Sequence, residues 1–224
     1  MDALRAAQTW LFDLDNTLYP AAVNLFAQMD VRMRAFIAAE LGVDEAAADA
    51  LRQRYYVEHG TTLTGLMRHH GTEPERFVAY VHDIDLSGVR SDPALDAALA
   101  RLPGRKIVFT NGSARHAERV LARLGVAGHF EAIFDIEAAN YVPKPQAAPY
   151  ARIVARHGID PCRAVMVDDA ARNLAPAAQA GMATVWVRTE SVHGRHGADG
   201  PHVHHVADDL AAFLDAIPPA HPMR

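Results

Sequence analysis

The chain has 224 residues, of which 50% are hydrophobic, and a formal net charge of −5, which is typical of a globular protein with one core domain and an insertion, or of two small domains. Acidic and basic residues are mixed along the chain and no run approaches the ~20 apolar residues of a membrane span, so neither a nucleic-acid nor a membrane partner is expected. Because Cys162 is the single cysteine and residues 1–8 lack the apolar stretch of a signal peptide, a cytoplasmic location is expected, whereas the oligomeric state is left open.

The first predicted strand, Thr9–Leu14, runs directly into two aspartates. Asp13 and Asp15 are spaced i and i+2, and side chains at this spacing on a strand point the same way. Two carboxylates so placed repel each other unless a cation, a proton or a reaction partner lies between them. A hard divalent cation such as Mg²⁺ suits such a pair. A solvent-exposed turn is the plainer alternative, because Asp and Asn favour turns.

The segment from about residue 20 to 90 contains helix signals and no good strand. Its apolar residues recur with helical period, and glycines follow the expected helix ends. Helices are predicted from Val23 to Leu41, over Glu45–His59 with Asp44 as cap, over Leu63–His70, and after Thr72–Glu75, which has the form of a capping box. We therefore expect an all-helical cap domain over residues 20–90, inserted into a core domain made of residues 1–19 and 91–224, with hinges near residues 19–22 and 86–91.

Beyond this segment, short apolar runs alternate with helical patterns. The predicted strands are Lys106–Thr110, Ala132–Ile136, Ala164–Val167 and Ala183–Val187, with a short edge strand over Val203–Val206. The predicted helices are one begun by Asp92-Pro93, Ala114–Leu124 with Ser113 as cap, Gln146–His157, Asn173–Ala180 and Asp208–Ala216. Repeated strand–helix–strand units with short loops predict a parallel sheet with right-handed crossovers. In such α/β folds the site lies at the carboxyl ends of the strands.

Four polar elements fall at these strand ends and helix starts. They are Asp13-Leu14-Asp15-Asn16-Thr17, Thr110-Asn111-Gly112-Ser113, Lys144-Pro145 and Asp168-Asp169. Each alone has a plain reading, as a turn, a helix cap or a solvated lysine. In this order and context they resemble the haloacid dehalogenase-like superfamily of hydrolases, over most of the chain from about residue 9 to 187. The resemblance implies a Rossmann-like α/β core with an inserted helical cap.

The resemblance also implies catalytic roles. Asp13 matches the nucleophile that attacks phosphorus and forms an aspartyl-phosphate. Asp15 matches the general acid/base that protonates the leaving alkoxide and later activates water. Lys144 matches the cation that holds the phosphoryl group beside Asp13 and offsets charge in the transition state.

The remaining core residues match binding roles. Thr110, Asn111 and Gly112 match the phosphate-binding loop, which uses a hydroxyl and backbone or amide N–H groups, and the helix start capped by the following serine supports anion binding there. Asp168 and Asp169 match the acidic pair that binds Mg²⁺ together with the Asp13 carboxylate and the Asp15 carbonyl. The match favours Asp169 as direct ligand and Asp168 as a water-mediated one.

Asp15 and the cap narrow the expected activity. Superfamily members that cleave carbon–halogen bonds lack the second aspartate, so Asp15 favours phosphoryl transfer. The segments 55–63 and 80–85 resemble the cap of pyrimidine 5′-nucleotidases, which implies a nucleoside 5′-monophosphate as substrate. Tyr55, Tyr56 and His82 are then candidates for contacts with base and ribose, while the alternative for the two tyrosines is packing between cap helices.

Other activities share the same core residues. A phosphatase for phosphoglycolate or sugar phosphates would differ only in its cap, and a phosphomutase would release little free phosphate. A non-catalytic binding protein would be expected to have lost Asp13, Asp15 or Lys144, and all three are present. The sequence therefore predicts a Mg²⁺-dependent phosphomonoesterase acting on a small phosphate ester.

Overall fold

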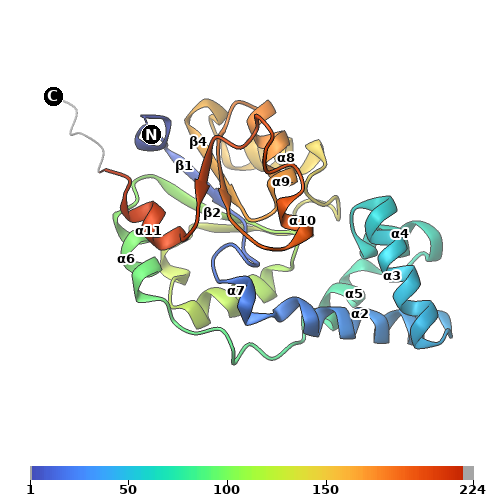
Figure 1. Ribbon diagram of the computed structural model, residues 1–224. Coiled ribbons are helices and arrows are strands. Elements are labelled where there is room, and N and C mark those ends of the chain that lie inside the picture. The colour runs from blue at the N-terminus through green and yellow to red at the C-terminus, as the bar shows by residue number, and fades with distance from the viewer. Residues whose placement is uncertain (1, 219–224) are drawn as a thin grey trace.

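The computed structural model describes residues 2–218 and contains a six-stranded sheet with helices on both faces (Figure 1). The strands are β1 (Thr9–Phe12), β2 (Arg105–Phe109), β3 (Ala132–Phe134), β4 (Ala164–Asp168), β5 (Ala183–Val187) and β6 (His205–Ala207). All neighbouring strands are parallel, in the order β3-β2-β1-β4-β5-β6. In the centre, Phe12 of β1 lies opposite Val108 of β2 and Val167 of β4. The predicted α/β fold class with a parallel sheet is confirmed.

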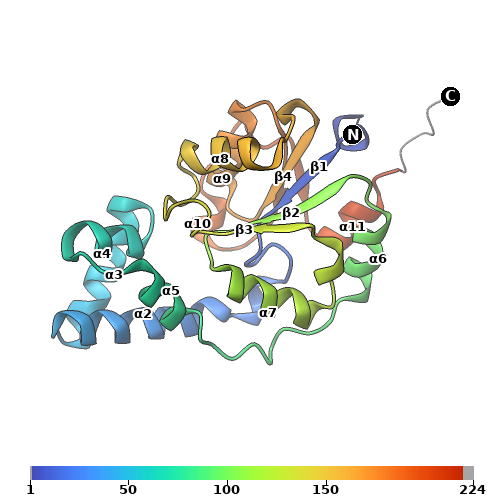
Figure 2. The same cartoon turned by 180° about the vertical axis from the view of Figure 1, so that it is seen from behind.

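Alternate residues of the central strand feed two hydrophobic clusters. Trp10 and Phe12 belong to one cluster and Leu11 to the other, as expected for a strand buried on both faces. The helices on the Trp10 side are α6 (Pro93–Arg101), α7 (Ala114–Leu124) and α11 (Leu210–Asp215), and those on the Leu11 side are α8 (Ala147–His157) and α9 (Ala171–Gln179). Figures 1 and 2 show these two layers from opposite sides.

Four further helices gather beside the sheet, next to its carboxyl end (Figures 1 and 2). They are α2 (Leu25–Leu41), α3 (Glu45–His59), α4 (Thr62–His70) and α5 (Pro74–Val81). The side chain of Asp44 accepts from the backbone N–H of Ala47 and so caps α3, as predicted. The buried side chains of these helices are continuous with the cluster on the Trp10 face of the sheet. The four-helix group is therefore packed onto the core through hydrophobic contacts.

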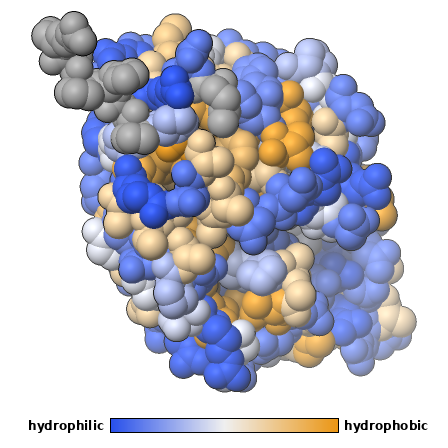
Figure 3. Space-filling model, turned by 60° about the vertical axis from the view of Figure 1, so that its left-hand side comes forward, coloured by the Kyte–Doolittle hydropathy of each residue, from blue (hydrophilic) through white to orange (hydrophobic). Residues whose placement is uncertain are grey.

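The short elements complete the chain. They are α1 (Asp2–Arg5), α10 (Val192–Arg195) and the 3-10 turns Ala21–Val23, Ala127–His129 and Pro161–Arg163. No helix of the described residues has the length and apolar character needed to cross a membrane. On the face shown in Figure 3, hydrophobic residues are interspersed with hydrophilic ones.

The capping box predicted at Thr72–Glu75 is wrong. Helix α5 begins at Pro74, with Glu73 at the N-cap position and no side-chain cap. The carboxylate of Glu75 instead accepts the hydroxyl of Tyr141 at 2.8 Å, across the boundary between the helical group and the core. Proline at the first position removes one of the helical N–H donors that a cap would satisfy, so the helix start forms without the box.

Candidate active site

Lys144 lies at the centre of a buried charge cluster at the carboxyl end of the sheet. Its ammonium group donates to Asp13 Oδ1 at 2.8 Å, to Asp168 Oδ2 at 2.8 Å and to the carbonyl oxygen of Phe109 at 2.7 Å. The residue is only 1% exposed. Burial lowers the pKa of the lysine, but the two carboxylates outweigh it, so the pKa of Lys144 is raised and the side chain stays charged. The surface alternative for Lys144 is thereby excluded.

Asn111 holds the backbone of Lys144 in place. The backbone N–H of Lys144 donates to Asn111 Oδ1 at 2.8 Å, and Asn111 Nδ2 donates to the Lys144 carbonyl at 3.2 Å. The peptide bond from Lys144 to Pro145 is cis. The oxygen and one N–H of the Asn111 amide are thus engaged with Lys144. The second amide N–H and the backbone N–H of Asn111 have no protein acceptor within the described chain, so both could donate to phosphate.

The helix start beyond Gly112 differs from the expectation. Ser113 caps α7 by accepting from the backbone N–H of His116 at 3.3 Å. However, the carboxylate of Asp135 already accepts the backbone N–H of Ala114 at 2.8 Å, so an acidic side chain takes the favourable place at this helix end. Open backbone donors lie instead in the loop after β1, where the N–H groups of Leu14 and Asp15 find no acceptor in the described protein. Successive free N–H groups of this kind suit an anion.

Three carboxylates converge beside Lys144. Oxygen atoms of Asp13, Asp168 and Asp169 lie within 4.8 Å of one another. Burial raises the pKa of Asp13 to about 7, with Lys144 opposing and Asp168 adding to the shift. Burial, reinforced by Asp13 and Asp168, raises the pKa of Asp169 to about 8. One ammonium group therefore does not offset the three negative charges that these groups would carry when ionised.

The carboxylates differ in how far protein donors satisfy them. Asp168 accepts from Asn173 Nδ2 at 3.0 and 3.1 Å and from the backbone N–H of Ala170 at 2.9 Å, besides Lys144. No donor in the described chain reaches the carboxylate of Asp169, although the residue is only 9% exposed. A cluster of hard oxygen atoms with two unbalanced charges fits Mg²⁺. The unsatisfied Asp169 fits a direct ligand, and the saturated Asp168 fits an indirect one.

Asp15 lies in a separate polar environment. Its Oδ1 accepts the hydroxyl of Tyr19 at 2.6 Å and Nε2 of His116 at 2.8 Å. Burial acts to raise the pKa of Asp15, but His116 and the hydrogen bonds from His116 and Tyr19 outweigh it, and the pKa is lowered. Burial and the nearby carboxylate raise the pKa of Tyr19, so its hydroxyl remains a donor. Two neighbouring aspartates thus have pKa values shifted in opposite directions.

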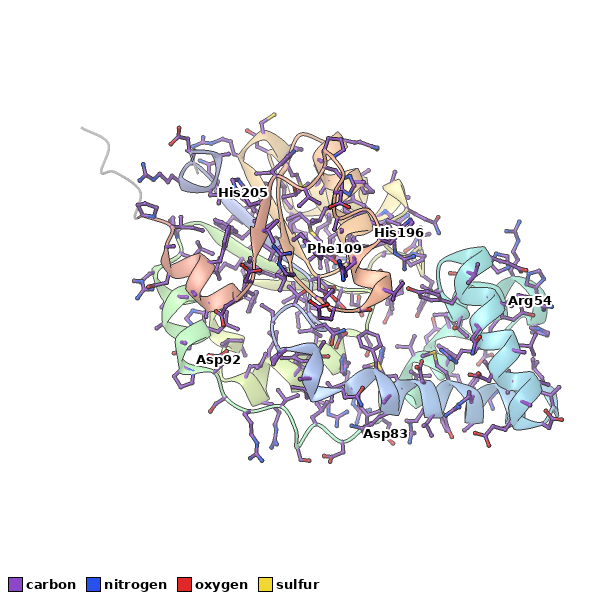
Figure 4. The ribbon with its side chains drawn as sticks, in the orientation of Figure 1. Arg54, Asp83, Asp92, Phe109, His196 and His205 are labelled. Carbon is purple, nitrogen blue, oxygen red and sulfur yellow. The ribbon has the colours of Figure 1, made fainter. Side chains whose placement is uncertain are left out.

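The three candidate residues of the cap have different surroundings. Tyr55 is 1% exposed, packs on α4 at Gly65, and its hydroxyl bonds His70 at 2.7 Å. Arg54, which also donates to that hydroxyl, lies at the outer side of the helical group, whereas Phe109 lies in the core (Figure 4). The side chain of Tyr55 therefore fills the interior of the helical group, in agreement with the alternative that it packs between helices.

Tyr56 and His82 instead reach the core. Arg172 lies on α9, just after the metal-binding candidates in the chain, and donates to the Tyr56 hydroxyl at 2.7 Å. Nδ1 of His82 lies 3.1 Å from Ser113 Oγ, and its ring stacks on His116 at 4.8 Å between centroids. Burial lowers the pKa of His82 to about 4, so this imidazole is neutral near pH 7. The structure brings His82 to the site and keeps Tyr55 away from it.

A cavity of about 640 Å³ opens between α5 and α7. His82, Ser113 and His116 are among its lining residues, and the side chain of His116 also bonds Asp15, which does not itself line the cavity. Aromatic and charged side chains from both the helical group and the core form most of the rest: Phe36, Tyr80, Tyr141, Arg32, Arg76, Arg115 and Arg119, with Glu75, Asp83, Asp135 and Glu137. Its size lies in the range of small-molecule sites.

Sequence reasoning missed His116 and Tyr19. The position of each residue in the sequence offers a weak signal. His116 lies three residues after the capping Ser113, on the inner side of the first turn of α7. Tyr19 follows Asp15 by four residues, and the loop after β1 brings its hydroxyl back to that carboxylate. Neither residue belongs to a motif that names a chemical role, so the sequence alone offered no reason to choose them.

Comparison with known proteins identifies the family. A sequence model of the haloacid dehalogenase-like hydrolases matches residues 8–181. The chain belongs to this family. It is 30% identical, over 80% of its length and 82% of the relative, to the glyceraldehyde 3-phosphate phosphatase of Methanopyrus kandleri. It is 29% identical over 57% of its length to Phosphate metabolism protein 8 of Saccharomyces cerevisiae, of which it spans 43%.

Solved structures with the same fold belong to this family as well. A haloacid dehalogenase-like protein from Streptococcus pneumoniae aligns with a TM-score of 0.58 and 15% identity, over 93% of this chain and 97% of that one. The 2-haloacid dehalogenase of Pseudomonas syringae aligns with a TM-score of 0.56 and 21% identity, over 92% and 96% of the two chains. At these identities the likeness establishes the fold and not the reaction.

Proposed function

We propose that this haloacid dehalogenase-like hydrolase is a Mg²⁺-dependent phosphomonoesterase that acts through an aspartyl-phosphate. The observation that carries the proposal is the buried cluster in which Lys144 bridges Asp13 and Asp168, with Asp15 held separately by Tyr19 and His116. The carboxylate of Asp13 is thereby kept beside the ammonium group of Lys144, whereas that of Asp15 is kept beside a hydroxyl and an imidazole. Paired acids with pKa values pushed apart are typical of separate nucleophile and acid/base roles.

In the first step, an oxygen of Asp13 attacks phosphorus and the ester oxygen leaves. Thr17 donates to Asp13 Oδ2 at 2.9 Å and Lys144 to Oδ1 at 2.8 Å, so the nucleophile is oriented before substrate binds. All three N–H donors of Lys144 are engaged with the protein. Binding of a phosphoryl oxygen by Lys144 therefore requires one of these hydrogen bonds to be shared.

Asp15 would give its proton to the leaving oxygen and recover one from the attacking water in the second step. The lowered pKa of Asp15 favours the ionised form in the substrate-free site. A phosphate dianion beside Asp15 raises the pKa of this carboxyl group, because a second negative charge nearby favours its protonation. When bound by Asp13, Asp169 and the carbonyl of Asp15, with Asp168 acting indirectly, Mg²⁺ would offset the phosphate charge beside the nucleophile.

We further propose that residues 20–90 act as a cap over a core formed by residues 1–19 and 91–224, and that the leaving group binds in the cavity between them. A pyrimidine nucleoside 5′-monophosphate remains our preferred substrate. The cavity volume of about 640 Å³ and its aromatic lining, which includes Tyr80 in one of the two nucleotidase-like segments, support that choice. We propose that His82 and Tyr80, and not Tyr55, are the cap residues nearest the leaving group. We also propose that the enzyme works in the cytoplasm.

A phosphatase for a small phosphorylated sugar or aldehyde is the second candidate. The relative from Methanopyrus kandleri, described as a glyceraldehyde 3-phosphate phosphatase, aligns over 82% of its own length. Such a substrate would use the same core residues and fill less of the cavity. Phosphoglycolate belongs to the same group of small esters.

The test is phosphate release from a panel of esters, with Mg²⁺ and with chelator. The panel contains UMP, CMP, a purine nucleotide, glyceraldehyde 3-phosphate, phosphoglycolate and a hexose phosphate. Metal-dependent release that favours UMP and CMP supports the nucleotidase, and release that favours the small esters selects the second candidate. Release that is unchanged by chelator contradicts the metal requirement, and transfer of phosphate between sugar positions without release identifies a mutase.

A further inference from the structure

The two oxygens of the Asp15 carboxylate have unequal surroundings. Oδ1 accepts both the Tyr19 hydroxyl, at 2.6 Å, and His116 Nε2, at 2.8 Å. Oδ2 has no hydrogen-bond donor in the described chain and faces the loop after β2, where a Cβ atom at Gly112 would lie 3.6 Å from it. A side chain at this position would therefore begin in van der Waals contact with Oδ2.

The His116 ring is covered by a residue of the helical group. His116 is 1% exposed, and the His82 ring stacks on it at 4.8 Å with 16° between the planes. His82 follows the last residue of α5 and also bonds Ser113 at 3.1 Å. Arg119 of α7 donates to the carbonyls of His82 at 3.0 Å and of Ile84 at 2.8 Å. The end of α5 is thus fastened onto α7 directly above the histidine that bonds Asp15.

We propose that His116 and Tyr19 are positioning residues that hold Oδ1 of Asp15 and leave Oδ2 for proton exchange with the leaving group, and that His82 completes this arrangement from the cap. The inference rests on the proposed phosphatase function. Neither residue touches the reacting atoms, so both act through Asp15.

The basicity of the leaving group decides how strongly the first step depends on Asp15. In the first step the Asp13–phosphorus bond forms, the ester oxygen–phosphorus bond breaks, and the proton of Asp15 Oδ2 passes to the ester oxygen. In the second, water attacks phosphorus, its proton passes to Oδ2, and inorganic phosphate leaves Asp13. An alkoxide such as a nucleoside 5′-oxygen needs that first proton, whereas p-nitrophenolate leaves without it.

The experiment compares p-nitrophenyl phosphate with the best alkyl phosphate of the wild-type enzyme in the variants His116→Ala, Tyr19→Phe and His82→Ala. The ratio kcat/KM reports only the steps up to departure of the leaving group. We expect kcat/KM for the alkyl ester to fall by roughly 10²-fold in His116→Ala, within the range for general acid catalysis, and by less in the other two. For the aryl ester, kcat/KM should stay within about threefold of wild type while kcat falls and a burst of p-nitrophenol appears, because only the second step still needs Asp15.

Control variants separate positioning from folding. His129→Ala breaks a similar imidazole–carboxylate pair on the surface, between His129 Nε2 and Asp96 Oδ1 at 2.6 Å, and should change neither ester. Asp15→Asn should show the same leaving-group pattern as His116→Ala in stronger form. His116→Gln, which returns a donor near the position of Nε2, should recover part of the loss on the alkyl ester.

Equal losses on both esters in His116→Ala and Tyr19→Phe would overturn the inference and leave the phosphatase function in place. Absence of hydrolysis of either ester by the wild-type protein would overturn the proposed function and this inference with it. If His116→Ala does not fold, as judged by circular dichroism, the nearly isosteric Tyr19→Phe decides the matter by the same comparison.

Discussion

Replacing Asp169 by Asn should stabilise the metal-free protein, and the gain should grow with pH. Asp169 is 9% exposed and no donor in the described structure reaches its carboxylate. Burial and the nearby Asp13 and Asp168 raise its pKa from the usual 3.8 to about 8. The folded state therefore binds this proton more tightly than the unfolded chain, so the stability linked to it is full below pH 3.8 and is lost as the pH rises towards 8.

The size of the effect follows from that pKa. Each unit of pKa difference is worth about 1.36 kcal/mol. Between about pH 5.5 and about pH 8.5, the wild-type protein should lose about 3 kcal/mol of unfolding free energy through Asp169, and Asp169→Asn should not. Mg²⁺ at about 100 times its Kd should return about 2.7 kcal/mol to the wild type and little to the variant.

Urea unfolding followed by circular dichroism, in chelator and in Mg²⁺ at the two pH values, measures the loss of unfolding free energy with pH and the stabilisation by Mg²⁺. Asp199→Asn, which removes an exposed carboxylate, is the matched control and should leave the pH dependence unchanged. If Asp169→Asn and wild type lose stability in parallel as the pH rises in chelator, Asp169 is not a destabilising buried charge. If Mg²⁺ stabilises the two proteins equally, Asp169 is not a ligand.

Three other substitutions test separate parts of the structure. Asp13→Asn should abolish phosphate release with the circular dichroism spectrum unchanged, since an amide is a poor nucleophile, and any retained turnover would refute the nucleophile assignment. Lys144→Ala should lower the free energy of unfolding by about 3–5 kcal/mol, because it leaves two buried carboxylates without their cation, and urea unfolding at neutral pH measures the loss. Gly65→Ala should cost about 1–3 kcal/mol, because its methyl group would overlap the ring of Tyr55; a melting temperature equal to wild type would contradict this packing.

The secondary structure followed from the sequence wherever a cap and a glycine marked both ends. Helix α7 runs from Ala114 to Leu124, as predicted from Ser113 before it and Gly125 after it. Strand β5 has its predicted bounds, while β1 ends at Phe12, before the predicted Leu14. That strand stops early because the chain turns into the loop that carries Asp13 and Asp15, and hydrophobicity alone does not mark this turn.

The candidate site was predictable only in part. Its core residues could be recognised because the motifs recur in a fixed order, and the structure brings Asp13, Lys144 and Asp168 within hydrogen-bonding distance. The cap residues could not be ranked, since the rotation of α3 about its axis decides which tyrosine faces inward. That rotation buries Tyr55 against Gly65 and turns Tyr56 towards Arg172, a result of packing between helices that no local pattern encodes.

Asp15, the proposed acid/base, is connected to the helical group through His116 and His82, whereas Asp13, the proposed nucleophile, is not. Leaving the core, the chain passes Asp15 and Tyr19 before it enters α2, and it returns through His82, which stacks on the histidine that bonds Asp15. The hydrogen-bond partners of Asp13, in contrast, are Lys144 and Thr17, which both belong to the core. A displacement of the helices would therefore remove His82 from the histidine that bonds Asp15, whereas Lys144 and Thr17 would stay with Asp13 in the core. Changes in the cap should then affect proton transfer to the leaving group more than capture of the phosphoryl group, so substrate choice and acid catalysis are expected to vary together.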